Sequence, residues 1–515
     1  MTYRWQDHQV HWDKELVSRA LIECDAVYRN ELSELAYDLN RYHGVSWSSA
    51  QYEKLIGLWL RDFIHLLYDR WNSPVVGKPS QFPWDARDPV DLLDHSSYHC
   101  SDSLNESLYW QLATLRDKRY LSNLPLPRRL SFSDSFDVRG GGRAPVHIFH
   151  TIHSPDISAW RRYVGSANFS RKLGFSASPI ELRPLQATTH QVATDWRLSQ
   201  TTRSVSNFTE ACAVLTRLHI PALFLEGFMP MRSAASNHQA NYLFATNGFY
   251  APFTYLAAEW HDRAVLLSHQ HGGGYGMDRL NTVETHERAV SDIFYSWGWS
   301  EGAAVRPLPA PPRVRAKPPE QRSGFLLKCG NFPRYVHRIS YQPMATANQT
   351  RIEQTIQFAK ALTEHGLEIS FYHHDYGWRV QEQFNDAGLT VREKSRDDGS
   401  YALHTCNYIG TAWLETLAAN IPTICFYNPS TYDFRETALP FVEELKSVGV
   451  LHESADSASD MVLGILDNPQ KWWQSDEVQE ARLSFVRKYA RLEDGWLNAW
   501  KEEFTQISNL GLEQS

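Results

Sequence analysis

A loop near the middle of the chain combines two histidines with several glycines, in the sequence HQHGGGYG over residues 269–276. Because a histidine titrates near neutral pH, His271 can act as a general base or as a cation beside a phosphate. Glycines let a backbone approach a ligand closely. A loop histidine bonded only to backbone is the alternative interpretation. The residues assigned to this candidate site are Gln270, His271, Gly272, Gly273, Gly274 and Tyr275.

The glycine spacing excludes two common kinds of nucleotide site. It fits neither GxGxxG nor the phosphate-binding loop with its Lys-Ser/Thr pair, so standard dinucleotide or ATP binding is not indicated. No third ligand follows His269 and His271 at a metal-binding spacing. We therefore expect neither a metal nor a tightly bound cofactor.

A carboxylate at the end of an apolar run is a second candidate. Glu226 ends the apolar part of PALFLEGF, residues 221–228, which we predict to be a strand. At the carboxyl end of a sheet, Glu226 could deprotonate an acceptor hydroxyl or orient it. A helix-cap or ion-pair role is the alternative.

Three segments in the C-terminal half are suited to anions. Each is expected where a strand ends, and such loops commonly bind phosphates at helix starts. A solvated basic loop is the alternative for the first segment, and a metal site is disfavoured for the second. The residues concerned are Lys328, Arg334 and Arg338 in the first segment, His373, His374 and Asp375 in the second, and Gly410, Thr411 and Glu415 in the third.

The elements that must position these residues follow from hydrophobic periodicity. Residues 12–72 predict two or three amphipathic helices. Short apolar runs predict strands at 146–152, 264–268 and 293–297, with a helix over 278–292. After a proline-rich stretch, strands and helices alternate again. The further predicted strands are 323–330, 367–374, 389–393 and 421–427, and the further predicted helices are 348–366, 378–388, 412–420 and a helical region from 456 onward.

This alternation predicts an α/β protein with two Rossmann-like, doubly wound domains facing a cleft, and with an N-terminal helical region. Residues 306–321 contain six prolines and predict an extended linker between the domains. The expected parts are residues 1–305 (helical region and first domain), 306–321 (linker), 322–490 (second domain) and 491–515 (C-terminal helix).

Composition limits the partners. The 515 residues carry a formal net charge of −8 with mixed signs, which argues against a general nucleic-acid binder. The six cysteines are far apart and indicate reduced core residues. The polar N-terminus does not resemble a signal peptide, and no apolar run approaches the roughly 18 residues of a membrane helix. We expect a cytoplasmic protein, and the sequence leaves its oligomeric state open.

Several of these motifs together resemble a known family. QHGGGYG, ETHERAVSDIFYSWGW, NFPRY, HHDYGW and GTAWLETLAANIPTICFY are similar to the surface-polysaccharide (O-antigen) transferase family first described in spirochaetes. The glycine loop and the GTAWLETL turn also resemble, more distantly, capsule Kdo transferases and teichoic-acid glycerophosphotransferases. Those families have the GT-B architecture, with the acceptor bound mainly by the N-terminal domain and the nucleotide donor by the C-terminal one.

The resemblance implies roles for individual residues. His271 stands where the relatives carry an essential histidine after Gln. Gly410, Thr411 and Glu415 match their donor-phosphate and ribose turn. His373 and His374 lie near their phosphate-binding histidine, although HHD replaces the capsule family's His-Pro.

The expected function is that of a metal-independent glycosyltransferase. It would move a sugar from a nucleotide-activated donor, such as CMP-linked Kdo or a nonulosonic acid, to a glycan or lipid-linked acceptor of the bacterial surface, in peripheral contact with the inner membrane. His271 or Glu226 would be the base. The alternatives are a CDP-glycerol-type polyol-phosphate transferase and a non-catalytic glycan-binding subunit.

Overall fold

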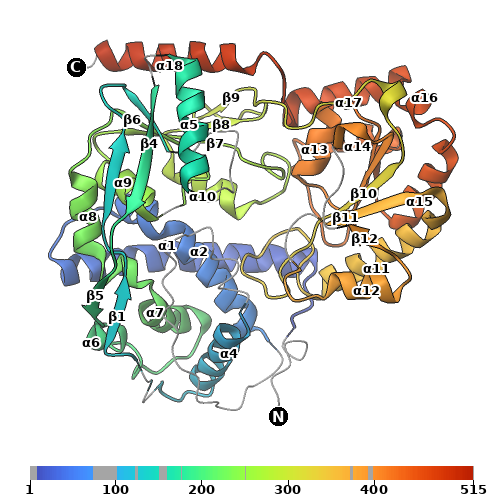
Figure 1. Ribbon diagram of the computed structural model, residues 1–515. Coiled ribbons are helices and arrows are strands. Elements are labelled where there is room, and N and C mark those ends of the chain that lie inside the picture. The colour runs from blue at the N-terminus through green and yellow to red at the C-terminus, as the bar shows by residue number, and fades with distance from the viewer. Residues whose placement is uncertain are drawn as a thin grey trace.

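The computed structural model describes residues 9–73, 101–121, 124, 126–149, 159–174, 177–249, 251–371, 375–392 and 398–513. Figure 1 shows two α/β lobes, with the first helices of the chain packed below the N-terminal lobe and against part of the C-terminal lobe. This is the expected α/β class and a GT-B-like arrangement. Within the described residues, no helix is long and apolar enough to span a membrane.

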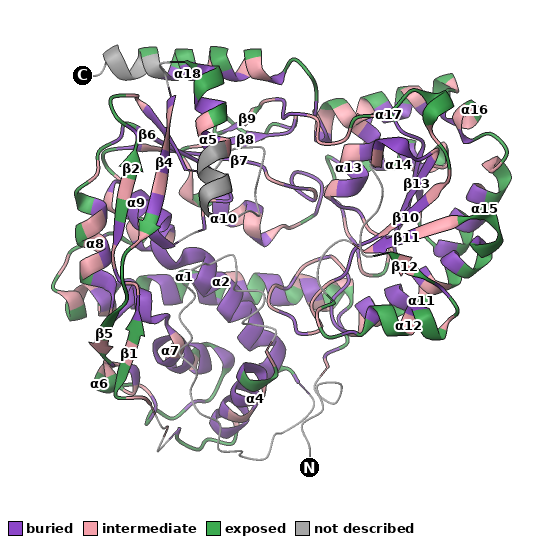
Figure 2. Cartoon of the chain, in the orientation of Figure 1, coloured by how far each residue is buried: buried purple, intermediate pink, exposed green. Residues whose placement is uncertain are grey.

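Two long helices begin the described chain, as predicted. They are α1 (Lys14–His43) and α2 (Ser49–Trp71). The Asp13 side chain caps α1 by accepting from the Leu16 N–H at 2.7 Å, and Ser48 and Gln51 form a capping box at α2. Helix α2 is buried on all sides over most of its length, including several charged residues (Figure 2). It is therefore a central helix and not a surface one.

The N-terminal lobe contains a seven-stranded sheet of order β2-β4-β3-β6-β7-β8-β9, parallel except for the β2–β4 pair. Its strands are β2 (Phe136–Gly140), β3 (Val146–Ile148), β4 (Ala177–Pro184), β6 (Tyr242–Thr246), β7 (Val265–His269), β8 (Ile293–Ser296) and β9 (Val305–Pro307). The other elements are α4 (Asp102–Arg116), β1 (Arg129–Phe132), α5 (Ala159–Leu173), β5 (Thr188–Gln191), α6 (Thr194–Arg197), α7 (Phe208–His219), η3 (Ala222–Phe224), α8 (Phe228–Ser236), α9 (Ala251–Glu259) and α10 (Thr282–Val290).

The C-terminal lobe contains a six-stranded, fully parallel sheet of order β12-β11-β10-β13-β14-β15. Its strands are β10 (Phe325–Cys329), β11 (Leu367–Phe371), β12 (Val391–Arg392), β13 (Leu403–Cys406), β14 (Thr423–Phe426) and β15 (Leu451–His452). Its helices are η4 (Pro319–Gln321), α11 (Thr346–Ala361), η5 (Thr363–His365), α12 (Val380–Asp386), η6 (Asp398–Ser400), α13 (Thr411–Ala418), α14 (Leu439–Ser447), α15 (Ala455–Ile465), α16 (Pro469–Trp473) and α17 (Asp476–Tyr489).

The predicted strand at residues 221–228 is wrong. The chain there forms the short helix η3 and then enters α8. A short apolar run is equally compatible with a buried strand and a buried helical turn, because both lack a polar face.

The last helix, α18 (Trp496–Glu513), returns to the N-terminal lobe. In Figure 1 it runs along the top of that lobe, beside α5. Trp500 packs edge-on against Phe244 at a ring distance of 5.5 Å, and Tyr242 Oη donates to the Ile507 carbonyl. The two ends of the chain therefore help to hold both lobes in one arrangement.

Candidate active site

The glycine loop of the N-terminal lobe touches the start of α13 in the C-terminal lobe. The Gly273 N–H donates to Thr411 Oγ1 at 2.9 Å. A Cβ atom on Gly273 would lie 2.7 Å from the Gly410 carbonyl carbon, and one on Gly272 would lie 2.9 Å from Thr411 Oγ1. The approach at Gly273 is to backbone atoms and excludes a side chain there, whereas at Gly272 it is to a side-chain atom, which can move. The structure thus brings the glycine loop and the predicted Gly410–Thr411 turn together, between the lobes.

His271 belongs to a chain of polar contacts that fixes its ring. Its Nδ1 lies 3.0 Å from Tyr275 Oη, which donates to Glu287 Oε2 at 2.6 Å. Burial holds the pKa of Tyr275 well above its usual value, so the phenol keeps its proton. Because that proton is directed at Glu287, the phenol oxygen can only accept from His271. A neutral His271 then carries its proton on Nδ1 and leaves Nε2 free as a base.

Glu287 was not among the predicted site residues. It lies on α10, where its side chain is almost fully buried, 3.7 Å from His271 Nδ1 through its other oxygen. A buried carboxylate beside an imidazole stabilises the protonated ring, as the aspartate does in serine hydrolases. The sequence signal that could have indicated Glu287 is ETHER, residues 284–288. Its two glutamates lie on a short helix directly after the loop, and both are buried.

Gln270 and His269 are positioning and core residues of the loop. Gln270 is fully buried; its Oε1 accepts from the Trp297 N–H at 2.9 Å and from Trp299 Nε1 at 3.0 Å. Its amide nitrogen donates to the Gly272 carbonyl at 2.9 Å. His269 ends β7 inside the lobe, with its ring 5.2 Å from that of Trp500. Neither side chain faces the junction of the lobes.

Glu226 does not lie at a strand end. Its carboxylate is buried and receives two bonds from Arg197, of 2.8 Å from Nε and 2.7 Å from Nη2. The Ala193 N–H donates a further bond of 3.1 Å. The interpretation of Glu226 as a base at the sheet edge is therefore wrong, because its position in a turn before α8 commits both oxygens to a buried ion pair.

The predicted cationic loop is not a free basic patch. Lys328 pairs with Asp398, Arg334 Nη2 donates to Asp102 at 2.6 Å, and Arg338 forms a two-bond pair with Asp62. Asp62 lies on α2 and Asp102 begins α4. The two arginines thus attach the loop of residues 331–345 to the N-terminal helices.

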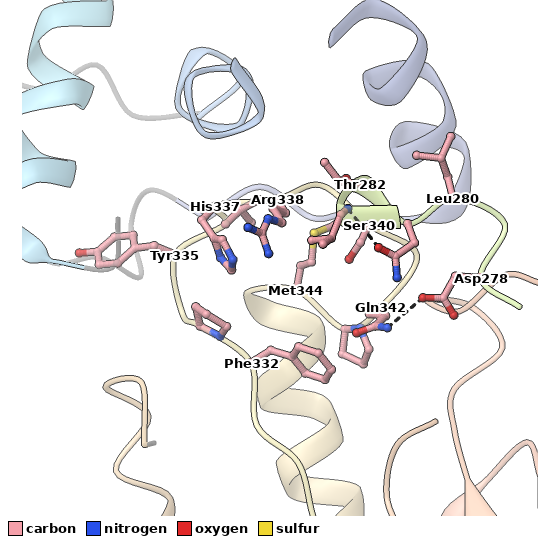
Figure 3. A pocket seen from close by; sticks show the side chains of 15 residues that line it. Asp278, Leu280, Thr282, Phe332, Tyr335, His337, Arg338, Ser340, Gln342 and Met344 are labelled. Carbon is pink, nitrogen blue, oxygen red and sulfur yellow. Dashed lines mark hydrogen bonds between the residues drawn. The ribbon is translucent and has the colours of Figure 1, made fainter. Parts of the chain in front are cut away.

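A cavity of about 240 Å³ opens between this loop and residues 278–283 of the N-terminal lobe. Figure 3 shows His337 and Arg338 directed toward it from one side, with Gln342 and Asp278 on the other. The charge of Arg338 acts on Tyr275 by lowering its pKa slightly against the dominant effect of burial. Arg338 thus lines the cavity and acts electrostatically on the phenol that contacts His271.

Asp278 connects the lobes at one edge of this cavity. Its carboxylate accepts from Tyr432 Oη and, at 3.1 Å, from Gln342 Nε2. Burial raises the pKa of Asp278 to about 7, with a smaller contribution in the same direction from Glu284. A carboxyl group with such a pKa can gain or lose a proton near neutral pH.

Arg313 joins the proline-rich linker to the candidate site. It was not among the residues predicted from the sequence. Its guanidinium lies 3.4 Å from both Glu415 Oε1 and the His271 carbonyl oxygen. Burial raises the pKa of Glu415, and the charge of Arg313 counteracts this. Glu415 is thus tied to the glycine loop through the proline-rich segment.

Of the remaining predicted residues, two lie outside the part of the chain that the structure describes and one has a structural role. His373 and His374 lie outside the described residues. Asp375 caps α12, because its oxygens accept from the Arg379 and Val380 N–H groups at 2.8 and 2.6 Å. Within the described chain, no group of three His, Cys, Asp or Glu side chains is placed to hold a metal.

Comparison with known proteins gives one match that covers nearly the whole chain. The model of the "LIC12162 family transferase" matches residues 4–504. No curated protein matches the chain.

Solved structures give partial likenesses. One is S. aureus MnaA with UDP (8% identity, TM-score 0.38, covering 72% of this chain and 96% of that chain). Another is UDP-GlcNAc 2-epimerase from Neisseria meningitidis with UDP-GlcNAc (7%, 0.36, 72% and 99%). A third is the spinosyn rhamnosyltransferase SpnG with spinosyn aglycone (9%, 0.32, 67% and 98%). On the near-complete match to the family model, the chain belongs to the LIC12162 family of transferases.

Proposed function

We propose that this transferase moves a sugar from a nucleotide-activated donor to a hydroxyl group of a glycan acceptor. The contact between the His271 loop and the start of α13 supports the proposal, because a candidate base from one lobe lies near a helix start from the other that is suited to a phosphate. Gly410 offers no side-chain cap to α13, so the first N–H groups of that helix can bind a phosphate.

The reaction would be a displacement at the anomeric carbon. His271 Nε2 takes the proton of the acceptor hydroxyl as its oxygen forms the bond to that carbon. The bond from the anomeric carbon to the phosphate oxygen breaks, and the nucleotide leaves with the electron pair. Arg338 and the start of α13 stabilise the negative charge that develops.

For the donor, we propose a CMP-activated acidic sugar such as Kdo or a nonulosonic acid, from the motif resemblance to capsule Kdo transferases. Such a donor carries a carboxylate on the sugar and one phosphate, and so requires two separate anion sites. Arg338 lines the cavity; its Nε and Nη2 hold Asp62, which leaves Nη1 for the sugar carboxylate. Arg334 is not among the lining residues of the cavity and already donates to Asp102. The acceptor would be a surface glycan or its lipid-linked precursor, met at the inner face of the membrane.

A thermal-shift screen with CMP, CDP, UDP, GDP and dTDP tests the donor class, because a bound nucleotide raises the melting temperature by mass action. Stabilisation by CMP is expected. Stabilisation by UDP or GDP without CMP would exclude an acidic sugar. Product analysis with CMP-sugars against CDP-glycerol then separates sugar transfer from transfer of a polyol phosphate.

A further inference from the structure

One buried arginine in the C-terminal lobe has unused hydrogen-bond donors. Arg351 lies on α11 and is 4% exposed. Its Nη2 donates to the Gly330 carbonyl and to Asn348 Oδ1, both at 2.7 Å. Its Nε and Nη1 have no hydrogen-bond partner. Leaving charged donors unpaired in the interior costs several kcal/mol.

The comparison with other buried arginines makes Arg351 exceptional. Within the described chain, four buried arginines each lie against a carboxylate, namely Arg61, Arg70, Arg197 and Arg217. Arg351 and Arg482 are buried without one. Arg482 donates to the Leu417 carbonyl and to Gln479, and none of its nitrogens is among the buried atoms that lack a partner. Among these six, only Arg351 lacks a carboxylate partner and also has two nitrogens, Nε and Nη1, without a hydrogen-bond partner.

Arg351 lies at the carboxyl edge of the sheet, where its strand order reverses. The chain leaves β10 for β11 on one side and later returns to β13 on the other, so β10 and β13 are adjacent. Gly330 follows β10, and its N–H donates to Asn407, which follows β13, at 2.9 Å. Crevices at such reversal points are where doubly wound sheets bind ligands.

A small pocket, lined by aromatic and polar side chains, adjoins the guanidinium. Arg351 lines it with Asn407, Asn428, Thr431 and Gln342, from three loops at the same sheet edge. These side chains offer amide and hydroxyl donors and no carboxylate. The pocket therefore presents one positive charge, with no carboxylate among its lining residues to balance it.

We propose that Arg351 binds a phosphate group of the nucleotide-activated donor; this rests on the proposed function. Nη1 carries two unpartnered N–H groups that can donate to phosphate oxygens, and the guanidinium supplies the positive charge that a phosphate requires. The bound phosphate supplies the counter-ion that the protein does not provide.

The pocket must open to admit this group. Its volume is about 10 Å³, about one water molecule. The half-buried ring of Tyr408 covers it, packed so tightly that a Cβ atom on Gly330 or Gly410 would lie 2.7 or 2.1 Å from the ring. Rotation of Tyr408 away from these glycines joins the pocket to the uncapped start of α13. One phosphate can then contact both Arg351 and the helix N–H groups.

Calorimetric titration of the full chain tests the assignment. The probes are CMP, UDP, GDP and inorganic pyrophosphate, with uridine as the probe that lacks phosphate. The variants are Arg351→Met, Arg351→Lys and the matched control Arg482→Met, which removes the other buried arginine without a carboxylate. Circular dichroism and melting temperature establish that each variant is folded.

Arg351→Met should weaken phosphate-containing probes by about 10- to 100-fold, the usual effect of losing charge-assisted bonds. Arg351→Lys should lie between Met and wild type, and Arg482→Met should bind as wild type. Equal binding by wild type and Arg351→Met, or the same loss in Arg482→Met, would overturn the proposal. If Arg351→Met does not fold, wild-type affinity for the phosphate-containing probes in Arg351→Lys would likewise overturn the proposal.

The two proposals fail in different ways. Binding of pyrophosphate that depends on Arg351, without binding of any nucleotide, would retain the anion site and contradict the proposed donor. Nucleotide binding that is independent of Arg351 would retain the donor and contradict the site. A wild-type protein that binds no phosphate compound would contradict both.

Discussion

The backbone N–H of Gly273 donates a 2.9 Å hydrogen bond to Thr411 Oγ1, across 138 positions of the chain. This bond joins the loop that carries His271 to the helix start proposed to hold the donor phosphate. It defines where the two lobes of the transferase meet, and it depends on a backbone position without a side chain.

Gly273→Ala should separate these two segments. A Cβ atom there would lie 2.7 Å from the Gly410 carbonyl carbon and 2.8 Å from the Thr411 nitrogen, and backbone atoms cannot move aside independently. Misplacement of reacting groups by about 1 Å can cost on the order of 100-fold in rate. Steady-state kinetics should show a large fall in kcat. Gly495→Ala is the control, since no atom lies within 4 Å of its Cβ position; equal rates in both variants would contradict this role.

Glu287→Gln should make His271 a weaker base while leaving its side chain in place. The variant keeps a hydrogen-bond acceptor for Tyr275 but loses the charge that stabilises a protonated His271. We expect kcat to fall by roughly 10- to 100-fold with KM little changed. An unchanged kcat, as expected for the exposed control Glu364→Gln, would place Glu287 outside the mechanism.

The raised pKa of Asp278 predicts that the free energy of unfolding depends on pH. Its pKa is about 7 in the folded protein, above the value of about 3.8 for an unperturbed carboxyl. The folded state therefore binds more protons between these values, and stability falls as the pH rises through that window. The contribution is up to about 4 kcal/mol, at about 1.4 kcal/mol for each pKa unit.

Chemical denaturation at pH 5 and pH 8 measures this effect. The difference in unfolding free energy between the two pH values should shrink in Asp278→Asn, which keeps an acceptor for Tyr432. Other buried carboxyls titrate in both proteins, so only the change between them reports on Asp278. An unchanged difference would mean that Asp278 is ionised throughout.

Glu226→Gln distinguishes a structural ion pair from a base. Removing the charge leaves Arg197 buried without its anion, which typically costs about 3–5 kcal/mol. The melting temperature should fall, while kcat measured below the transition should stay near the wild-type value. A stable variant with strongly reduced kcat would restore Glu226 as a catalytic candidate.

Local elements of the fold could be predicted because their signals are local. The apolar run before the glycine loop and the periodicity of α1 and α2 both lie within a few neighbouring residues. The run at residues 221–228 failed because burial alone does not distinguish a strand from a helical turn.

The pairing of charges could not be predicted. Arg334 and Arg338 are 232 and 276 positions from Asp102 and Asp62, and nothing near the arginines indicates those carboxylates. Conversely, Arg351 lies inside a predicted helix, where a sequence offers no sign that its counter-ion is missing. The sequence thus indicated the loops of the candidate site, but not which of the nearby arginines are paired with a carboxylate.

The most direct measurement is release of nucleotide from a panel of nucleotide-activated sugars, with acceptor present, by wild type and His271→Ala. We predict that wild type turns over at least one donor, with CMP-activated acidic sugars expected first. His271→Ala should lose roughly two or more orders of magnitude in kcat, as expected for a lost general base, while its nucleotide affinity and circular dichroism remain those of wild type. Near wild-type turnover by His271→Ala, or no turnover of any nucleotide sugar by the wild-type protein, would contradict the account.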